Sequence, residues 1–166
     1  AVDAFYLHGL VAAARLGAGA AATLTGDERL AARAELADAV GRWAGWAAEC
    51  PANFAARHAI LVAEQARVDG EDEAAAAAYK QAVRIARRHG ELGSEALACE
   101  LAGRHAAAHG DDVFSDMYFQ AASNAYAKWG AEAKAQQLAR AHGLRTRRSA
   151  SDEAGPRESF DLSSLI

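Results

Sequence analysis

Residues 70–90 read GEDEAAAAAYKQAVRIARRHG, an Ala-rich and charged segment with a glycine at each end. Glycine recurs at the same interval at Gly110 and Gly130, so four glycines stand twenty residues apart. A glycine just past a helix end adopts the left-handed conformation that stops the helix, because it has no Cβ to clash. The spacing therefore predicts helices that alternate with turns, two helices to every forty residues.

The forty-residue interval aligns residues 56–90 with residues 96–130. Small residues then match small ones, and an aromatic residue matches another. The pairs are Ala63 with Gly103, Gly70 with Gly110, Tyr79 with Phe119, and Ala82 with Ala122. This is the pattern of tetratricopeptide repeats, in which a small residue lets two helices cross and an aromatic fills the space between repeats. Cys99 and Ala106 stand where that repeat has its consensus Trp and Tyr.

We therefore predict an all-α fold, a tetratricopeptide-like α-solenoid of about seven antiparallel helices in a right-handed superhelix. The alternative is a generic Ala-rich helical bundle in which the glycine spacing is accidental. The expected helices cover residues 2–19, 28–49, 54–69, 72–89, 94–109, 112–129 and 131–142. Thr25 or Asp27 is expected to cap the second helix, and Asn53 the third. Gly90, Trp129 and Gly130 complete the structural positions of the repeat.

Composition agrees with helices and excludes several classes of function. Of the 166 residues 47 are Ala, the best helix former, and only two are Pro. The net charge is −4 with both signs interspersed, so no basic face for nucleic acid is expected. No apolar run approaches the length of a membrane span. Cys50 and Cys99 are expected to be reduced thiols of a cytoplasmic protein, a disulfide being the less favoured alternative.

Three segments differ in character along the chain. Residues 1–143 form the expected helical-repeat domain. Residues 144–158, LRTRRSASDEAGPRE, have the composition of a flexible linker. Residues 159–166, SFDLSSLI, turn apolar again and are expected to begin the connection to a downstream domain.

A groove lined by the first helix of each pair is the candidate binding surface, by analogy with tetratricopeptide arrays. An Arg there would make charge-assisted hydrogen bonds to a peptide or to a neighbouring domain. The alternative is an ordinary solvated face. The positions that this geometry selects are Arg57, Ile60, Glu64, Arg67, Glu100 and Arg104.

The aromatic residues have a structural and a functional interpretation. Trp43 and Trp46 share one helix face and are expected to fill the core, an exposed patch for a partner being the alternative. Trp129 is expected to pack under the last helix.

Two histidines are candidate metal ligands. His105 and His109 are four residues apart on one expected helix, so both could reach one ion. No Cys or Asp at ligand spacing completes a site, so no metal is predicted. His89 and His109 each precede a turn glycine, where they are expected to satisfy the last carbonyls of a helix.

No motif in the chain predicts catalysis. The serines lack a G-x-S-x-G elbow, and no G-x-x-x-x-G-K phosphate loop occurs. The acidic residues at 71–73 and 111–112 are expected to begin helices, where negative charge is favoured. The chain is therefore predicted not to be an enzyme and to need no cofactor.

Four stretches are more specific than the repeat pattern. Residues 124–134, NAYAKWGAEAK, resemble a "Y-x-x-W-G-A-x-A-K" signature, and residues 50–54, CPANF, resemble a "C-P-x-N-F" helix junction. Residues 95–102, EALACELA, are similar to "E-A-L-A-N-E-L-A", with Cys99 in place of Asn. Residues 160–166, FDLSSLI, are similar to an "L-D-L-x-T-V-L" that leads into a GAF sensor domain.

These motifs resemble the helical-repeat region of very large bacterial signalling proteins. That family combines a serine/threonine-kinase-like domain, an AAA-type or STAND-type predicted ATPase, helical repeats, a GAF domain and often a histidine kinase. The resemblance implies a non-catalytic scaffold that couples the ATPase to the sensor kinase, since the family's kinase and ATP-binding motifs lie outside this segment. The alternative is a stand-alone peptide-binding tetratricopeptide adaptor. The expected partner is a protein, and the exposed ends of a repeat array predict self-association.

Overall fold

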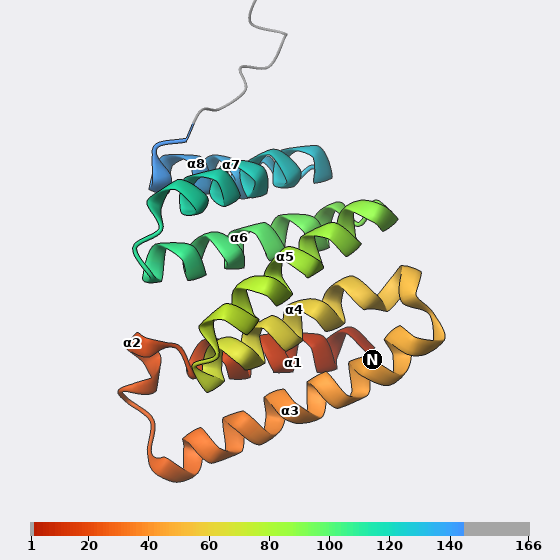
Figure 1. Cartoon of the computed structure of the whole chain (residues 1–166), viewed down its shortest axis with the longest axis vertical. Helices are drawn as coiled ribbons and strands as arrows, with labels where there is room; N and C mark the ends of the chain where they lie inside the picture. Colours follow the sequence, from red (N-terminus) through yellow and green to blue (C-terminus); the bar gives the residue numbers. More distant parts are fainter. Residues whose placement is uncertain (1, 145–166) are drawn as a thin grey trace, which may run out of the picture.

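The structure is a computed structural model that describes residues 2–144, and within this range every regular element is an α-helix (Figure 1). The predicted all-α fold is confirmed for these residues. Beyond Leu144, the expected linker and connection lie outside the described residues. The helices are α1 Val2–Arg15, α2 Ala18–Ala21, α3 Gly26–Glu49, α4 Pro51–Asp69, α5 Asp72–His89, α6 Leu92–Ala108, α7 Asp112–Trp129 and α8 Glu132–His142.

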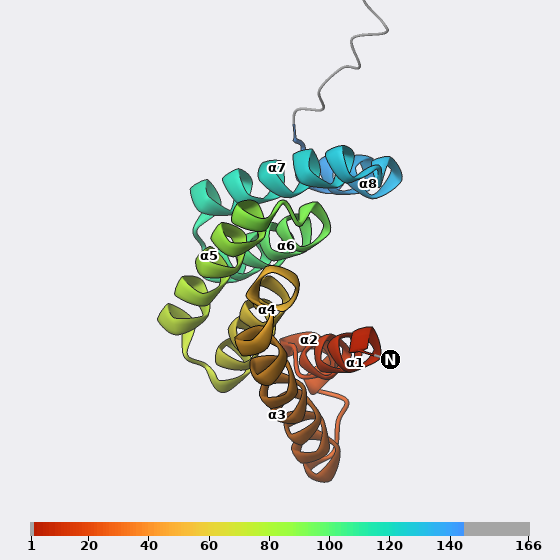
Figure 2. The same cartoon turned by 90° about the vertical axis from the view of Figure 1, so that its right-hand side faces the viewer.

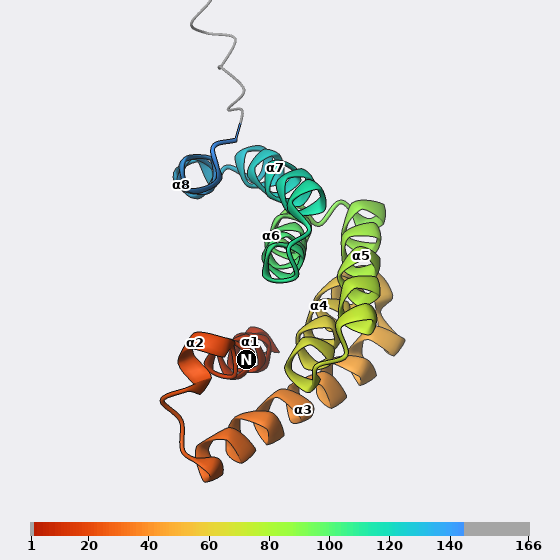
Figure 3. The ribbon, with the colours of Figure 1, turned by 60° about the vertical axis from the view of Figure 1, so that its left-hand side comes forward.

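The helices lie across the long axis of the molecule, from α3 at one end to α7 and α8 at the other (Figure 1). From α3 onward, each helix packs against the next one along the chain, and α1 packs against both α3 and α4. Figures 2 and 3 show α5 on one side of the stack and α1, α2 and α8 on the opposite side, with α4 and α6 between them. Helices that are not consecutive in sequence also come together, as α1 and α4 do.

The four evenly spaced glycines end four helices in the same way. Gly70, Gly90, Gly110 and Gly130 all have φ between 70° and 91°, the left-handed conformation that the sequence predicts. After each glycine, the next backbone N–H bonds to the carbonyl oxygen five residues earlier, which satisfies an otherwise open carbonyl of the last turn. These bonds are Glu71 to Ala66 at 2.9 Å, Glu91 to Ala86 at 2.9 Å, Asp111 to Ala106 at 3.0 Å, and Ala131 to Tyr126 at 2.9 Å.

The small and the aromatic repeat positions lie close together in both helix pairs. Ala63 on α4 is fully buried in the same apolar cluster as Tyr79 on α5. Gly103 on α6 lies so close to Phe119 on α7 that a Cβ would meet the ring carbons at 3.0 Å. Ala82 and Ala122 are fully buried as well. The small residues therefore let the helices of each pair approach closely.

An aromatic cluster fills the core at the other end of the stack. Trp43 on α3 is fully buried, and its ring lies 5.3 Å from Tyr6 and 5.6 Å from both Trp46 and Phe54, between ring centroids. The core-filling prediction is confirmed for Trp43, whereas Trp46 is half-buried. Cys50 and Cys99 are both free thiols, and burial raises the pKa of Cys99 to about 11.

Two predicted helix boundaries differ from the structure by three residues or more, for local reasons. The first expected helix stops at Arg15, because Gly17 takes an extended conformation with ψ of 153° and separates the short α2 from α1. α4 begins at Pro51, because proline fits the first turn of a helix, where its missing N–H is not needed. Asn53 therefore lies inside α4 and does not cap it. Thr25 does cap α3, in a reciprocal capping box with Glu28.

The prediction for Trp129 is also wrong. Its side chain is 59% exposed and is not covered by α8. The ring lies against Gly93 near the start of α6, where an added Cβ would meet it at 3.0 Å. Trp129 therefore shields the backbone at the start of α6 while one side of the indole faces solvent.

Replacing a stop glycine should destabilise the fold through the backbone alone. Nothing lies within 4 Å of a Cβ added at Gly110, so Gly110→Ala costs only the strain of its positive φ. We expect a loss of about 1 kcal/mol in the free energy of unfolding, measured by urea titration.

The matched control is the same substitution inside a helix. Gly41 lies in α3 with equally open space around its Cβ position. There, Gly41→Ala should raise the stability by about 0.5–1 kcal/mol, because alanine has the higher helix propensity. Two substitutions of the same sign would contradict the assignment of Gly110 as a stop.

Candidate functional site

The six predicted groove residues divide into buried and accessible ones. Ile60, Glu64 and Glu100 are buried, so the prediction that they line an open surface is wrong. Their helix faces point into the core, where a partner does not reach them. The three arginines, Arg57, Arg67 and Arg104, remain half-buried or exposed. Each of them is engaged by another group of the chain.

The Glu64 carboxylate joins three helices. The Tyr79 hydroxyl on α5 donates a hydrogen bond to Oε1 of Glu64. Arg67, one turn along α4, donates to Oε2 at 2.6 Å and also to the Ala13 carbonyl oxygen on α1 at 2.9 Å. Burial raises the pKa of Tyr79, and the negative charge of Glu64 adds to this effect, so the phenol stays protonated as a donor. The network ties α1, α4 and α5 together.

The Glu100 carboxylate does the same at the other end of the stack. It accepts the Tyr126 hydroxyl of α7 at 2.8 Å and the Lys134 ammonium of α8 at 3.0 Å, and it pairs with Arg104 on its own helix. Burial acts to raise the pKa of Glu100, but the hydrogen bonds from Tyr126 and Lys134 and the charge of Arg104 outweigh it and lower the pKa. Glu100 therefore holds α6, α7 and α8 as a charged acceptor.

Arg57 connects the start of α4 with α1. Its guanidinium forms an ion pair with Asp3 at 2.8 Å and lies over the rings of Tyr6 and Trp43, at 5.8 and 5.9 Å from their centroids. Such stacking of a guanidinium on aromatic faces is favourable by about 0.5–1 kcal/mol. Arg57 therefore closes the aromatic cluster at its solvent edge.

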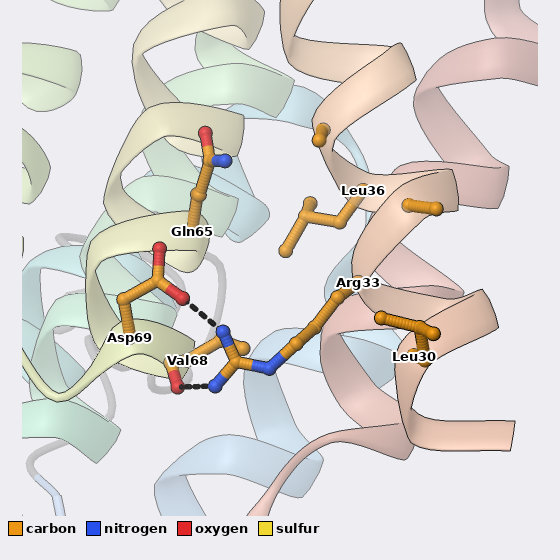
Figure 4. Close-up of a pocket in the computed structure, with 8 residues that line it drawn as sticks. Leu30, Arg33, Leu36, Gln65, Val68 and Asp69 are labelled. Carbon is orange, nitrogen blue, oxygen red and sulfur yellow. Dashed lines mark hydrogen bonds and ion pairs between the residues drawn. The ribbon is translucent and has the colours of Figure 1, made fainter. Parts of the chain in front are cut away.

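A pocket of about 300 Å³ lies between α3 and α4 (Figure 4). Arg33 crosses it from α3, pairs with Asp69 and donates to the Val68 carbonyl oxygen at 2.9 Å. The guanidinium thus satisfies an open carbonyl at the end of α4. Leu30 and Leu36 line the α3 side of the pocket. Arg33 and Asp69 neutralise each other, so the pocket offers no unpaired charge to a ligand. We interpret it as a packing contact between α3 and the end of α4.

A cluster of ligand-type side chains lies where α5 begins and α6 ends. Asp72, His105 and His109 each offer one ligand atom, and these atoms all lie within 4.8 Å of one another. His109 Nε2 is 3.1 Å from Asp72 Oδ2, and His105 Nε2 is 3.1 Å from the backbone oxygen of Asp72. No Cys or Asp stands at ligand spacing from the histidines in the sequence, whereas the structure places the Asp72 carboxylate beside both of them. The antiparallel packing of α5 and α6 brings Asp72 beside histidines that follow it by 33 and 37 residues.

The two histidines of this cluster have opposite environments. Burial and the positive charge of His109 lower the pKa of His105. The pKa of His109 is raised, first by its hydrogen bond to the His105 carbonyl oxygen and then by Asp72. That bond, from Nδ1 at 2.8 Å, confirms the prediction that His109 satisfies a carbonyl of the last turn. The same role for His89 stays a prediction.

Exposed apolar side chains gather on the first turns of α7. Val113, Phe114 and Met117 are 79%, 53% and 51% exposed, and Met117 is the helical neighbour of both others. The residues forty positions earlier on α5 are Glu73, Ala74 and Ala77, which are exposed too. These positions thus face solvent in both helices, but only α7 carries large apolar groups there. We call Val113, Phe114 and Met117 the α7 patch.

Comparison of the chain with protein-family models, curated proteins and solved structures finds no match. The resemblance to bacterial signalling proteins therefore stays a prediction from the sequence motifs. None of the helices within residues 2–144 is both long enough and apolar enough to cross a membrane.

The Glu100 network should contribute to stability in a pH-dependent way. Glu100→Gln keeps the size of the side chain and removes the charge that accepts from Lys134. We expect a loss of about 2 kcal/mol at pH 7, since hydrogen bonds to charged groups contribute about that much. Because folding lowers the pKa of Glu100, this contribution is present above the unfolded value of about 4.3 and is lost as pH falls through the folded pKa. Urea titrations at pH 7 and below pH 4 measure the difference.

An exposed pair with the same spacing is the control. Asp38 and Arg42 on α3 are also four residues apart, at 2.7 Å, but both are exposed. Asp38→Asn should cost no more than about 0.5 kcal/mol. Equal losses for the two variants, or a Glu100→Gln deficit that does not shrink in acid, would show that Glu100 is not a buried charged acceptor.

Proposed function

We propose that this chain is a non-catalytic, tetratricopeptide-like α-solenoid that presents a protein-interaction surface, and that it serves as the helical-repeat scaffold of a cytoplasmic, multidomain bacterial signalling protein. The four identical glycine stops and the matched contacts of Ala63 with Tyr79 and of Gly103 with Phe119 support the repeat architecture. The sequence motifs at residues 50–54, 95–102 and 124–134 support the signalling context.

The α7 patch is the main observation in favour of a protein-interaction surface. Large apolar side chains at positions that face solvent in the equivalent helix do not serve the core. Clustered exposed apolar side chains on a soluble domain are typical of protein contacts. The other exposed large apolar side chains of the described part form smaller groups: Leu7 and Val11 are helical neighbours on α1, whereas Leu30 on α3 and Trp129 at the end of α7 stand alone.

Charge around the α7 patch defines the partner. Asp111, Asp112 and Asp116 surround the three apolar residues, and each of them is exposed. A complementary segment therefore presents apolar side chains flanked by Lys or Arg, as in an amphipathic helix or an extended peptide. The same aspartates disfavour a second copy of this chain on this face, because its own three aspartates would lie against them.

Binding at α7 has a direct route to the rest of the scaffold. Tyr126 lies further along the same helix and donates to Glu100 on α6, which also holds Lys134 on α8. A force that tilts α7 therefore moves α6 and α8 with it as one unit. In the proposed signalling protein, this unit transmits the position of one neighbouring domain to the next.

The second candidate is a stand-alone peptide-binding adaptor. The exposed Arg104 favours it, because the guanidinium stays at the surface of α6 with donors left over from its pair with Glu100. An adaptor of this kind would bind acidic peptides at α6, whereas the scaffold binds basic-flanked segments at α7. The two candidates therefore differ in the charge of the preferred peptide and in the helix that binds it.

Fluorescence anisotropy with two designed peptides tests the proposal. Both are fifteen-residue amphipathic helices with one leucine face, and their flanks are either lysine or glutamate. The chain should bind the lysine-flanked peptide more tightly. Met117→Glu should weaken this binding about tenfold or more, since burial of such a side chain contributes about 1.5 kcal/mol or more. Ala77→Glu, the same change at the equivalent position of α5, is the matched control and should leave binding unaltered.

Three outcomes would contradict the proposal. Preference for the glutamate-flanked peptide with loss in Arg104→Ala would support the adaptor in its place. Equal effects of Met117→Glu and Ala77→Glu would remove α7 as the binding surface. Light scattering that shows a dimer abolished by Met117→Glu would assign the α7 patch to a second copy of the chain.

A further inference from the structure

The cluster of Asp72, His105 and His109 is not used by the proposed interaction surface. Two of its members come from the end of α6 and one from the first turn of α5, so it bridges the two helix ends. All three are ligand types that bind divalent transition metals: two imidazole nitrogens and one carboxylate oxygen. Three protein ligands with one position left for water make the usual coordination of an open zinc site.

The distances fit a bound ion after small side-chain rotations. Two ligand atoms on one tetrahedral Zn²⁺ lie about 3.4 Å apart, given metal–ligand bonds of about 2.0–2.1 Å. His109 Nε2 and Asp72 Oδ2 are 3.1 Å apart, and no pair in the cluster exceeds 4.8 Å. The side chains of His109 and Asp72 are about half exposed, so they can adjust.

Second-sphere contacts already orient one ligand. The Nδ1 of His109 donates its proton to the His105 carbonyl oxygen at 2.8 Å. In the neutral ring this leaves the lone pair on Nε2, the atom that faces Asp72. Histidine ligands of metals are commonly held in this way, with the non-coordinating nitrogen bonded to a carbonyl or carboxylate.

An unsatisfied buried nitrogen is the second, independent sign of a ligand. His105 is only 8% exposed, and its Nδ1 has no hydrogen-bond partner within residues 2–144. A buried polar atom without a partner is destabilising unless something satisfies it. A cation bound at Nδ1 would satisfy this atom, while Nε2 keeps its hydrogen bond to the backbone oxygen of Asp72. The charge of Arg67 reaches His105, but Arg67 is paired with Glu64, and the acidic Glu71 and Glu73 flank Asp72, so the local charge favours a cation.

We propose that Asp72, His105 and His109 bind one Zn²⁺ ion, with water at the fourth position, and that this ion clamps the start of α5 to the end of α6. Binding to the folded chain alone then raises its thermal stability by mass action. The site lies on different helices from the α7 patch, so its existence does not depend on the proposed function.

Isothermal titration of the metal-free chain with ZnCl₂, with melting followed by circular dichroism, tests the site. We expect one equivalent of Zn²⁺ to bind, with a rise of about 5 °C or more in the melting temperature at a hundredfold excess over Kd. Asp72→Asn and His109→Ala change accessible side chains and should fold, yet each should weaken binding about tenfold or more. Co²⁺ in place of Zn²⁺ should give the visible absorption of a low-coordinate site in the wild type and not in the variants.

His89→Ala is the matched control, because His89 precedes Gly90 at the end of α5 as His109 precedes Gly110, but it is not part of the cluster. This variant should bind Zn²⁺ like the wild type. No binding heat and no melting shift up to 1 mM Zn²⁺ (roughly the weak limit for a specific site) would overturn the proposal. Equal losses in His89→Ala and His109→Ala would also overturn it.

Discussion

The hydrogen bond that closes each helix over a left-handed glycine is the constraint on which the rest of the structure depends. At Gly70, Gly90, Gly110 and Gly130 the chain reverses within two residues, and the following N–H returns to the last turn of the helix just ended. Because the interval between these glycines is constant, consecutive helices have similar lengths and lie antiparallel. Side chains of consecutive helices therefore meet across the turn, as Tyr79 on α5 meets Glu64 on α4.

The core that these reversals create is made largely of alanine, which brings little apolar area per residue. Small side chains stabilise this core mainly by letting neighbouring helices approach closely, as where Gly103 on α6 contacts the ring of Phe119 on α7. Two buried carboxylates add hydrogen bonds between helices to this alanine-rich core. Glu64 joins α1, α4 and α5, and Glu100 joins α6, α7 and α8, so each end of the stack is held by one charged acceptor with several donors. A buried charge with this many partners favours one packing arrangement over alternatives.

Sequence patterns predicted the parts of the structure that depend on local chemistry. α5 and α7 begin and end where the sequence pattern places them. Each of them lies between two of the regularly spaced glycines and has acidic residues in its first turn. The helix start at Pro51 does not follow from the sequence alone, because Asn53 is an equally good local signal for a cap. Glu64 and Glu100 are predicted to line a groove by analogy with tetratricopeptide arrays. Their burial depends on partners that the analogy does not include: a tyrosine of the next helix for each, together with basic residues of the same helix and, for Glu100, Lys134 of α8. The contact between Asp72 and His109 cannot be read from sequence spacing, because it depends on which helix ends meet. Comparison of residues 113–117 with residues 73–77 would have revealed the α7 patch, since large apolar residues there replace Glu and Ala.

Hydrogen exchange of backbone amides, measured by NMR, tests the role of the glycine stops most directly. The amides of Glu71, Glu91, Asp111 and Ala131 donate the closing bonds, so their exchange should be slowed about as much as that of amides inside the helices. The amides of Asp72 and Glu73, next to the first of these donors, lie in the first turn of α5 without an intrahelical acceptor and should exchange fast. Fast exchange at all four closing amides would contradict the account, because the reversals that position the helices would then not be fixed by these bonds.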